Sequence, residues 1–170
     1  MDGAFAKIKR MKTILAPVDF TEVSPKTAAT AYSLIDDVHV DLVFIHVLPA
    51  KLTNRYISAN SSASPNALQS IEARAVEKLR ELVRKARIQG ISATYMLAYG
   101  SPAIEILNAA KKVRADLIVM GSHDYNSPEG SVVGCTTKTV LYATPCPIVI
   151  VPSDHASAIS NRELTASVAR

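Results

Sequence analysis

Five short apolar runs alternate along the chain with stretches of helical periodicity. The runs cover residues 13–18, 41–47, 91–98, 116–120 and 147–151. Strands that alternate with helices join into a parallel sheet, because each helix carries the chain back across one face of that sheet. The order of elements therefore predicts an α/β fold with a doubly wound parallel sheet.

Four stretches between the runs have the spacing of amphipathic helices. We expect Thr21 or Ser24 to cap the first, which has Pro25 in its first turn and runs to about residue 36. The others are expected at about 66–89, ended by Gly90, after the turn at 100–102, and from Gly134 to about 142. The side chains expected to face the sheet are Ala28, Ala31 and Ile35 in the first helix, Leu68, Ile71, Ala75, Leu79, Leu82 and Ala86 in the second, and Ile104, Leu107, Ala110 and Val113 in the third.

The composition suits one sheet that is buried on both faces. The chain is 48% hydrophobic but only 5% aromatic, so its apolar content is mainly aliphatic. A length of 170 residues favours a single domain. We expect a basic extension over residues 1–11, the α/β domain over 12–152 and a polar tail over 153–170.

Charge and cysteine content argue against several classes of protein. The net charge is +4, but the basic residues between 74 and 87 alternate with glutamates, which is typical of a solvated helix face and not of a nucleic-acid surface. No apolar run is long enough to span a membrane. The two cysteines cannot form a disulfide framework, so we expect a reduced, cytoplasmic setting.

The loop after the fourth apolar run is the first candidate for a binding site. The run leads into Gly-Ser-His at residues 121–123, and Gly134 opens the next helix. Ligands of open α/β sheets bind at the carboxyl ends of strands, and the unpaired amides of a helix start attract anions. Thr136 and Thr137 add hydroxyl donors, and Asp19 can hold a ribose hydroxyl if the first and fourth strands are neighbours. The pattern predicts a nucleotide site.

The sequence resembles the universal stress protein family. The resemblance covers about residues 12–152 and rests on the segments APVDFTE, HVLP, GSPA, ADLIVMGSH and TPCPIVIVP. It implies a regulatory protein of the stress response with a five-stranded sheet in the order 3-2-1-4-5. It also implies a homodimer joined through the last strand, from Pro147 to Val151, which would otherwise be an exposed apolar edge.

Many members of that family bind ATP through a Gly-x-x-Gly, nine-residue spacer, Gly-Ser/Thr motif. Here Gly121 and Gly134 keep their places, but Asp124 stands at the second glycine position and Cys135 at the serine or threonine position. Aspartate tolerates a positive φ less well than glycine does, and its charge repels phosphates. We therefore expect weak binding of an adenine nucleotide, ATP or AMP, with no metal beyond the Mg²⁺ that accompanies a nucleotide.

The resemblance also assigns contacts in the crevice between the first and fourth strands. Adenine and ribose would contact Pro17, Val18, Asp19, Val47, Met120 and Gly121, and the phosphates would face His123, Gly134, Thr136 and Thr137. The alternative interpretation is that Gly121 and Gly134 only shape a turn and that Asp19 caps the start of the first helix.

Signatures of catalysis are weak. The chain has neither a Gly-x-Ser-x-Gly elbow nor a P-loop, and the contiguous Ser122, His123 and Asp124 cannot adopt the geometry of a triad. His46 is expected to be a hydrogen-bonded structural histidine. Two alternatives to a nucleotide-binding regulator stay open: an interaction module that binds a protein partner and no nucleotide, and a slow ATPase.

Overall fold

The computed structural model describes residues 11–35, 39–49, 66–122 and 134–153. His123 and Asp124 lie outside these described residues, as do most of the predicted extension and tail. The predicted boundaries of extension, domain and tail therefore stay predictions. Within the described ranges, no helix has the length and apolar character needed to cross a bilayer.

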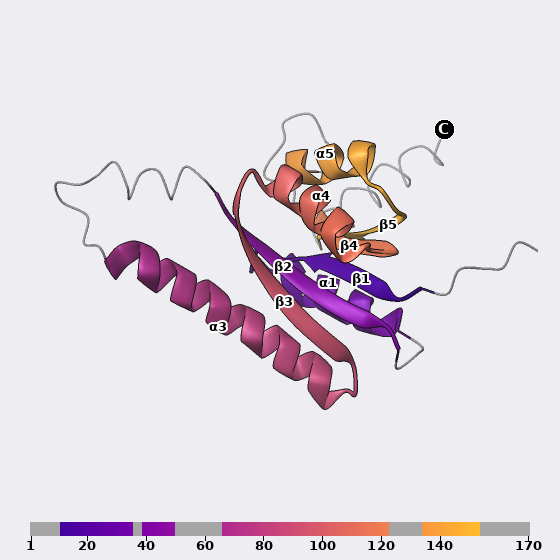
Figure 1. Cartoon of the computed structure of the whole chain (residues 1–170), viewed down its shortest axis with the longest axis horizontal. Coiled ribbons are helices and arrows are strands. Elements are labelled where there is room, and N and C mark those ends of the chain that lie inside the picture. The colour runs from indigo at the N-terminus through magenta and orange to yellow at the C-terminus, as the bar shows by residue number, and fades with distance from the viewer. Residues whose placement is uncertain (1–10, 36–38, 50–65, 123–133, 154–170) are drawn as a thin grey trace, which may run out of the picture.

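Strands and helices alternate along the described chain as predicted. In order they are β1 (Thr13–Pro17), α1 (Val23–Ser33), β2 (Asp41–Pro49), α3 (Asn66–Ile88), β3 (Ser92–Gly100), α4 (Pro102–Val113), β4 (Leu117–Ser122), α5 (Cys135–Ala143) and β5 (Ile148–Pro152). The strands form one parallel sheet in the order β3-β2-β1-β4-β5 (Figure 1). The predicted fold and strand order are confirmed.

The helices cover both faces of the sheet. On one face α1 and α3 enclose a core that contains Ile14, Phe44 and Leu79. On the other face α4 and α5 enclose a core that contains Leu15 and Val140. Successive side chains of a strand point to opposite faces, so Ile14 and Leu15 enter different cores. This is why β1 reads in the sequence as a continuous apolar run.

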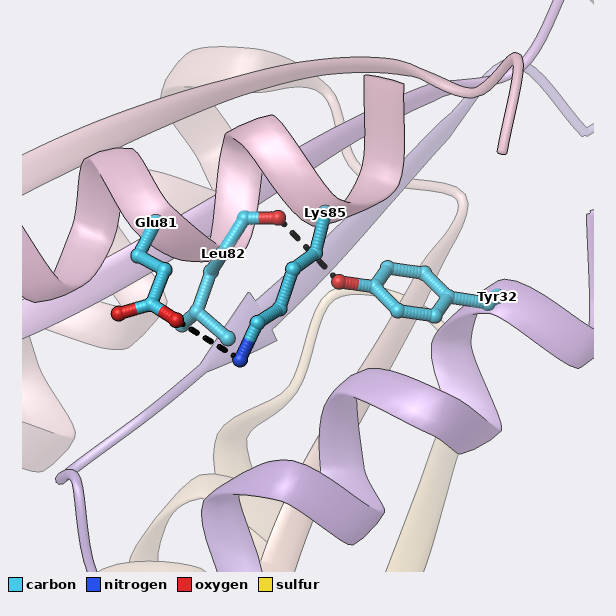
Figure 2. A network of polar contacts seen from close by, with 4 residues as sticks. All are labelled: Tyr32, Glu81, Leu82 and Lys85. Carbon is cyan, nitrogen blue, oxygen red and sulfur yellow. Dashed lines mark hydrogen bonds and ion pairs between the residues drawn. The ribbon is translucent and has the colours of Figure 1, made fainter. Parts of the chain in front are cut away.

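The long helix follows its prediction closely. Ala75, Leu79 and Ala86 are buried against the sheet, and Gly90 follows the helix with φ 78°, a conformation that favours glycine. A hydrogen bond from the Tyr32 hydroxyl of α1 to the main-chain carbonyl of Leu82, 3.3 Å long, ties α3 to α1 (Figure 2). The position of α3 relative to α1 is therefore fixed by a polar contact as well as by the shared core.

Two helix predictions need correction. α1 ends at Ser33 and not near residue 36, and the Ser33 hydroxyl donates to the Thr30 carbonyl at 2.9 Å in its last turn. In α4, Ile104 was expected to face the sheet but is 57% exposed, whereas Ala103 and Ile106 are buried. The apolar residues of α4 form two overlapping stripes, and the alanine-rich stripe faces the sheet because small side chains let the helix approach closely.

Candidate functional site

The first and fourth strands are neighbours that part at the carboxyl end of β1. Their register pairs Ile14 with Leu117 and Leu15 with Ile118, and the ladder goes no further. On its other side β1 stays paired with β2 as far as Pro17. Beyond these pairs the two strands share no ladder bonds at their carboxyl ends, which is where ligands of this fold bind and where the predicted crevice would lie.

Pro17 gives a physical reason for this parting. The carbonyl of Thr13 faces β4, because it accepts a hydrogen bond from the Asp116 N–H at 2.9 Å. The main-chain N–H and C=O groups of every second residue point to the same side of a strand. The main-chain nitrogen of Pro17, four residues after Thr13, therefore also points toward β4. Proline has no N–H to donate, and the ladder ends there. The next residue, Val18, turns its N–H to the Ile45 carbonyl of β2 at 2.8 Å.

Asp19 follows directly and organises the turn into α1. Its Oδ1 accepts hydrogen bonds from the Thr21 N–H at 3.0 Å, the Thr21 hydroxyl at 2.6 Å and the Ser24 hydroxyl at 2.9 Å. The N-cap residue of α1 is Glu22, and its side chain accepts no hydrogen bond from the helix amides. The prediction that Thr21 or Ser24 caps the helix is therefore wrong. Both hydroxyls bond instead to the carboxylate, which is the stronger acceptor because it is charged. Asp19 therefore holds the turn that leads into α1 but does not cap the helix, because none of these bonds comes from a main-chain amide of α1.

Phe20 was not singled out by the sequence analysis. Its φ of 63° lies in the left-handed region, which bulky residues rarely adopt. Its ring stacks on the His46 ring with 4.3 Å between centroids, and Lys78 Nζ of α3 lies 5.0 Å from the Phe20 centroid. The one signal in the sequence is an aromatic residue inside a turn of polar residues. These contacts connect the segment after β1 to β2 and to α3.

His46 joins the ends of β1 and β2. Its Nδ1 lies 2.8 Å from the Val18 carbonyl oxygen, and since a carbonyl only accepts, Nδ1 carries the proton. Burial lowers the pKa of the imidazole below its ordinary 6.5, the charge of Lys78 acts in the same direction, and the Val18 bond and Asp19 charge oppose them. The prediction of a hydrogen-bonded histidine is confirmed.

Gly121 lies in β4, and a side chain at this position would point toward α1. A Cβ at this position would lie 2.6 Å from Cγ1 of Val23 and 3.1 Å from Oγ1 of Thr27. The first distance is too short for carbon atoms, so the packing of α1 on β4 requires glycine here. The α1 side of Gly121 is therefore filled by the protein itself, and Gly121 does more than shape a turn.

The start of α5 is attached to the same end of β4. Thr137 is buried, and its hydroxyl donates to the Gly121 carbonyl at 3.2 Å. Gly134 is the N-cap with φ −61° and provides no side-chain cap bond, so within the described ranges the first amides of α5 are not capped by a side chain. Cys135 is exposed and Thr136 is partly buried. These amides and the Thr136 hydroxyl lie at the start of α5, where the predicted phosphate contacts would be made.

The described site residues lie toward the carboxyl ends of the parallel strands and at the start of α5. They are Pro17, Val18 and Asp19 at the end of β1, Val47 in β2, Met120 and Gly121 in β4, and Gly134, Thr136 and Thr137 at the start of α5. Their contact with a ligand stays a prediction, and His123 lies outside the described residues. Among the side chains that the structure describes, no three His, Cys, Asp or Glu residues are placed to hold a metal ion.

Comparison with known families decides the identity of this fold. The model of the universal stress protein family matches residues 11–152. The chain belongs to the universal stress protein family. It is 27% identical to the universal stress protein YxiE of Bacillus subtilis, over 81% of this chain and 97% of the relative. It is 28% identical to a universal stress protein of Synechocystis, over 83% of this chain and 85% of the relative.

Solved structures of the family share the fold. The hypothetical protein MJ0577 superposes with a TM-score of 0.74 and 20% identity, over 85% of this chain and 97% of the other. A universal stress protein in complex with cAMP superposes with a TM-score of 0.59 and 17% identity, and covers 84% of this chain and 97% of its own. A family protein from Arabidopsis thaliana with AMP bound has a TM-score of 0.57, also at 17% identity and with the same coverage.

Proposed function

We propose that this universal stress protein is a cytoplasmic regulator whose crevice between β1 and β4 binds an adenine nucleotide. The observation that carries the proposal is the parting of the two strands at Pro17, at the edge where doubly wound sheets bind ligands. The relatives that were solved with cAMP and with AMP bound support the choice of an adenine ligand.

The described residues offer chemistry suited to each part of such a ligand. Val18, Val47 and Met120 are buried apolar residues beside the crevice and would pack against adenine. Asp19 is exposed and would accept a hydrogen bond from a ribose hydroxyl. The first amides of α5 would bind a phosphate group, because a helix start carries partial positive charge.

The charges between residues 122 and 135 favour a nucleotide with one phosphate group over a nucleotide with three. Between Ser122 and Cys135 the chain has Asp124 and Glu129 but no lysine or arginine. Two unit charges ~5 Å apart repel by roughly 3 kcal/mol at an effective dielectric constant near 20. Micromolar binding is worth only about −8 kcal/mol, so this repulsion weakens a triphosphate severely. AMP or a cyclic monophosphate is the expected ligand, and Mg²⁺ enters only with a polyphosphate.

Thermal unfolding with added nucleotides tests the proposal. A ligand at 100 times its Kd adds about 2.7 kcal/mol to the free energy of unfolding. We expect AMP or cAMP to raise the melting temperature at lower concentration than ATP does. Mass spectrometry of the purified protein would show any nucleotide that is retained. If AMP, ADP, ATP and cAMP all fail to stabilise the protein, it is an interaction module without a nucleotide.

A substitution that adds a negative charge at the start of α5 tests whether the phosphate group binds there. In Gly134→Asp the new residue remains a favourable N-cap, so the helix is kept while a carboxylate meets the phosphate. Thr139→Asp makes the same change of charge on an exposed position of the same helix. We expect Gly134→Asp to weaken AMP binding at least about tenfold and Thr139→Asp to leave it within about twofold.

We also propose that the protein is a homodimer joined through β5, one edge of the sheet. The Pro147 carbonyl faces β4, because it accepts from the Ile118 N–H at 3.0 Å. By alternation, the N–H groups of Ile148 and Ile150 face outward, where a second copy can pair with them. Tyr142 at the end of α5 is 89% exposed and adds apolar surface. A two-fold axis would cover this edge with its own copy.

A further inference from the structure

A groove lies beside β3, at the edge of the sheet opposite to β5, and it is not part of the proposed nucleotide site. It lies between α3 and β3, is open to solvent and has a volume of about 630 Å³. Its lining residues are Arg80, Val83, Arg84, Arg87, Ile88, Thr94 and Tyr95. Three of them are arginines spaced at helical intervals, and none is acidic. The groove is therefore a basic surface with an apolar floor.

The arginines differ in how they are engaged. Arg87 donates from Nε at 3.3 Å and from Nη2 at 3.0 Å to the carbonyl of Ala93 in β3. Arg80 and Arg84 have no hydrogen bond or ion pair with any residue in the described ranges, although the charge of Arg84 contributes, after Lys85, to the lowered pKa of Glu81. The carboxylate of Glu81 is bound to Lys85 at 2.9 Å, as Figure 2 shows. Two guanidinium groups are thus available to an anionic partner.

The groove runs along the outer edge of the sheet. β3 is an edge strand, and α3 lies alongside it (Figure 1). The Arg87 bond shows that the Ala93 carbonyl points away from β2, so the main-chain groups of Tyr95 and Leu97 point outward as well. No described main-chain group pairs with these two residues on that side. An open edge of this kind can accept one more strand.

We propose that the groove between α3 and β3 binds an extended acidic segment of a partner protein, added as a sixth strand beside β3. Alternate side chains of an added strand lie ~6.6 Å apart on one face. Residues four apart on a helix, such as Arg80 and Arg84, are separated by ~6 Å along its axis. Acidic residues at alternate positions would therefore meet these two arginines in register. Ile88, 72% exposed at one end of the groove, offers contact to an apolar side chain.

Charge and chemistry favour this occupant over others. A second copy of this chain would bring its own arginines against the same groove. A nucleic acid would satisfy the arginines but has no amide ladder to pair with Tyr95 and Leu97. Its bases would also find one aromatic side chain, Tyr95, among the lining residues. Only a peptide matches both the basic helix and the open strand edge.

Peptide binding to the full chain tests the proposal. The probe is a labelled ten-residue peptide in which glutamate alternates with valine, compared by fluorescence anisotropy with the same peptide carrying glutamine. We expect the glutamate peptide to bind at least about tenfold more tightly, with a difference that shrinks as salt is added. Methylation of alternate amide nitrogens removes the ladder donors of the peptide and should abolish most of the binding.

Two double variants that lose the same charge at different places test whether the peptide binds in this groove. We expect Arg80→Gln with Arg84→Gln to weaken binding about tenfold, and Lys111→Gln with Lys112→Gln, the same loss of charge on α4, to change it less than about twofold. Binding should also protect the Tyr95 and Leu97 amides from hydrogen exchange. Equal binding of the glutamate and glutamine peptides, indifference to amide methylation, equal effects of both double variants, or stronger competition by oligothymidylate would each overturn the proposal.

Discussion

Val23 of α1 occupies the space that a side chain at position 121 would need. The 2.6 Å between Val23 Cγ1 and a hypothetical Cβ at Gly121 means that α1 and β4 can pack as they do only if that residue is glycine. The glycine that is predicted to contact a nucleotide therefore also has a packing role in the fold. The two roles can be separated by measuring stability and binding on the same variants.

We expect Gly121→Ala to lower the free energy of unfolding by about 1–3 kcal/mol, because the added methyl group is forced against Val23. Val23→Ala in the same chain removes the clash and should restore part of the loss. Chemical denaturation of both single variants and the double variant measures the coupling. If the two substitutions are simply additive, the contact does not constrain position 121.

Stability should depend on pH through His46. Burial holds the pKa of its imidazole below 6.5 in the folded protein, so between the two pKa values the unfolded chain binds more protons. Stability is therefore full above about pH 6.5 and is lost as the pH falls toward the lowered pKa, with a slope of at most ~1.4 kcal/mol per pH unit. Denaturation midpoints from pH 7.5 to 5 measure the slope.

Asparagine at position 46 provides the matched variant. It keeps an N–H donor where Nδ1 lies but does not titrate, so His46→Asn should remove this part of the pH dependence. An unaltered slope in His46→Asn would assign the pH dependence to another group.

We expect Asp124→Gly to strengthen ATP binding by about tenfold or more, because it removes a carboxylate from the phosphate-binding motif and restores glycine there. AMP affinity should change less, since AMP has fewer charges near the loop. Calorimetry with both ligands gives the ratio. Unchanged or weaker ATP binding would contradict the electrostatic explanation of the altered motif.

The dimer proposal predicts an effect confined to one edge of the sheet. Tyr142→Glu puts a charge on the exposed apolar surface near β5 and should weaken self-association at least about tenfold. Ile88→Glu makes the same kind of change beside the other edge, where Ile88 is 72% exposed. Sedimentation velocity over a range of concentrations compares the two. A dimer that resists Tyr142→Glu but dissociates with Ile88→Glu would place the interface at β3.

The topology could be predicted from the sequence because its signals are local or carried by family motifs. Each strand is an apolar run, each helix has its own periodicity, and the family resemblance added the strand order. The positions of Asp19, Gly121 and Gly134 at one edge of the sheet follow from that order alone. Their contacts with a nucleotide, and the dimer, stay predictions.

Other features depend on contacts between distant parts of the chain and leave little trace in the sequence. The stack of Phe20 on His46 joins β1 to β2, and Lys78 above it belongs to α3. Ile104 was misplaced because α4 has apolar residues on two adjacent sides, and only the shape of the sheet decides between them. Bonds of Thr21 and Ser24 to Asp19, instead of to the helix amides, reflect a nearby charge that propensity scales omit.

The nitrogen of Pro17 has one further consequence. Because an imino acid in β1 ends the ladder with β4, this break is set by β1 itself and not by the residues that follow β4. The ladder would therefore end at the same place in a chain that carried a different sequence after β4.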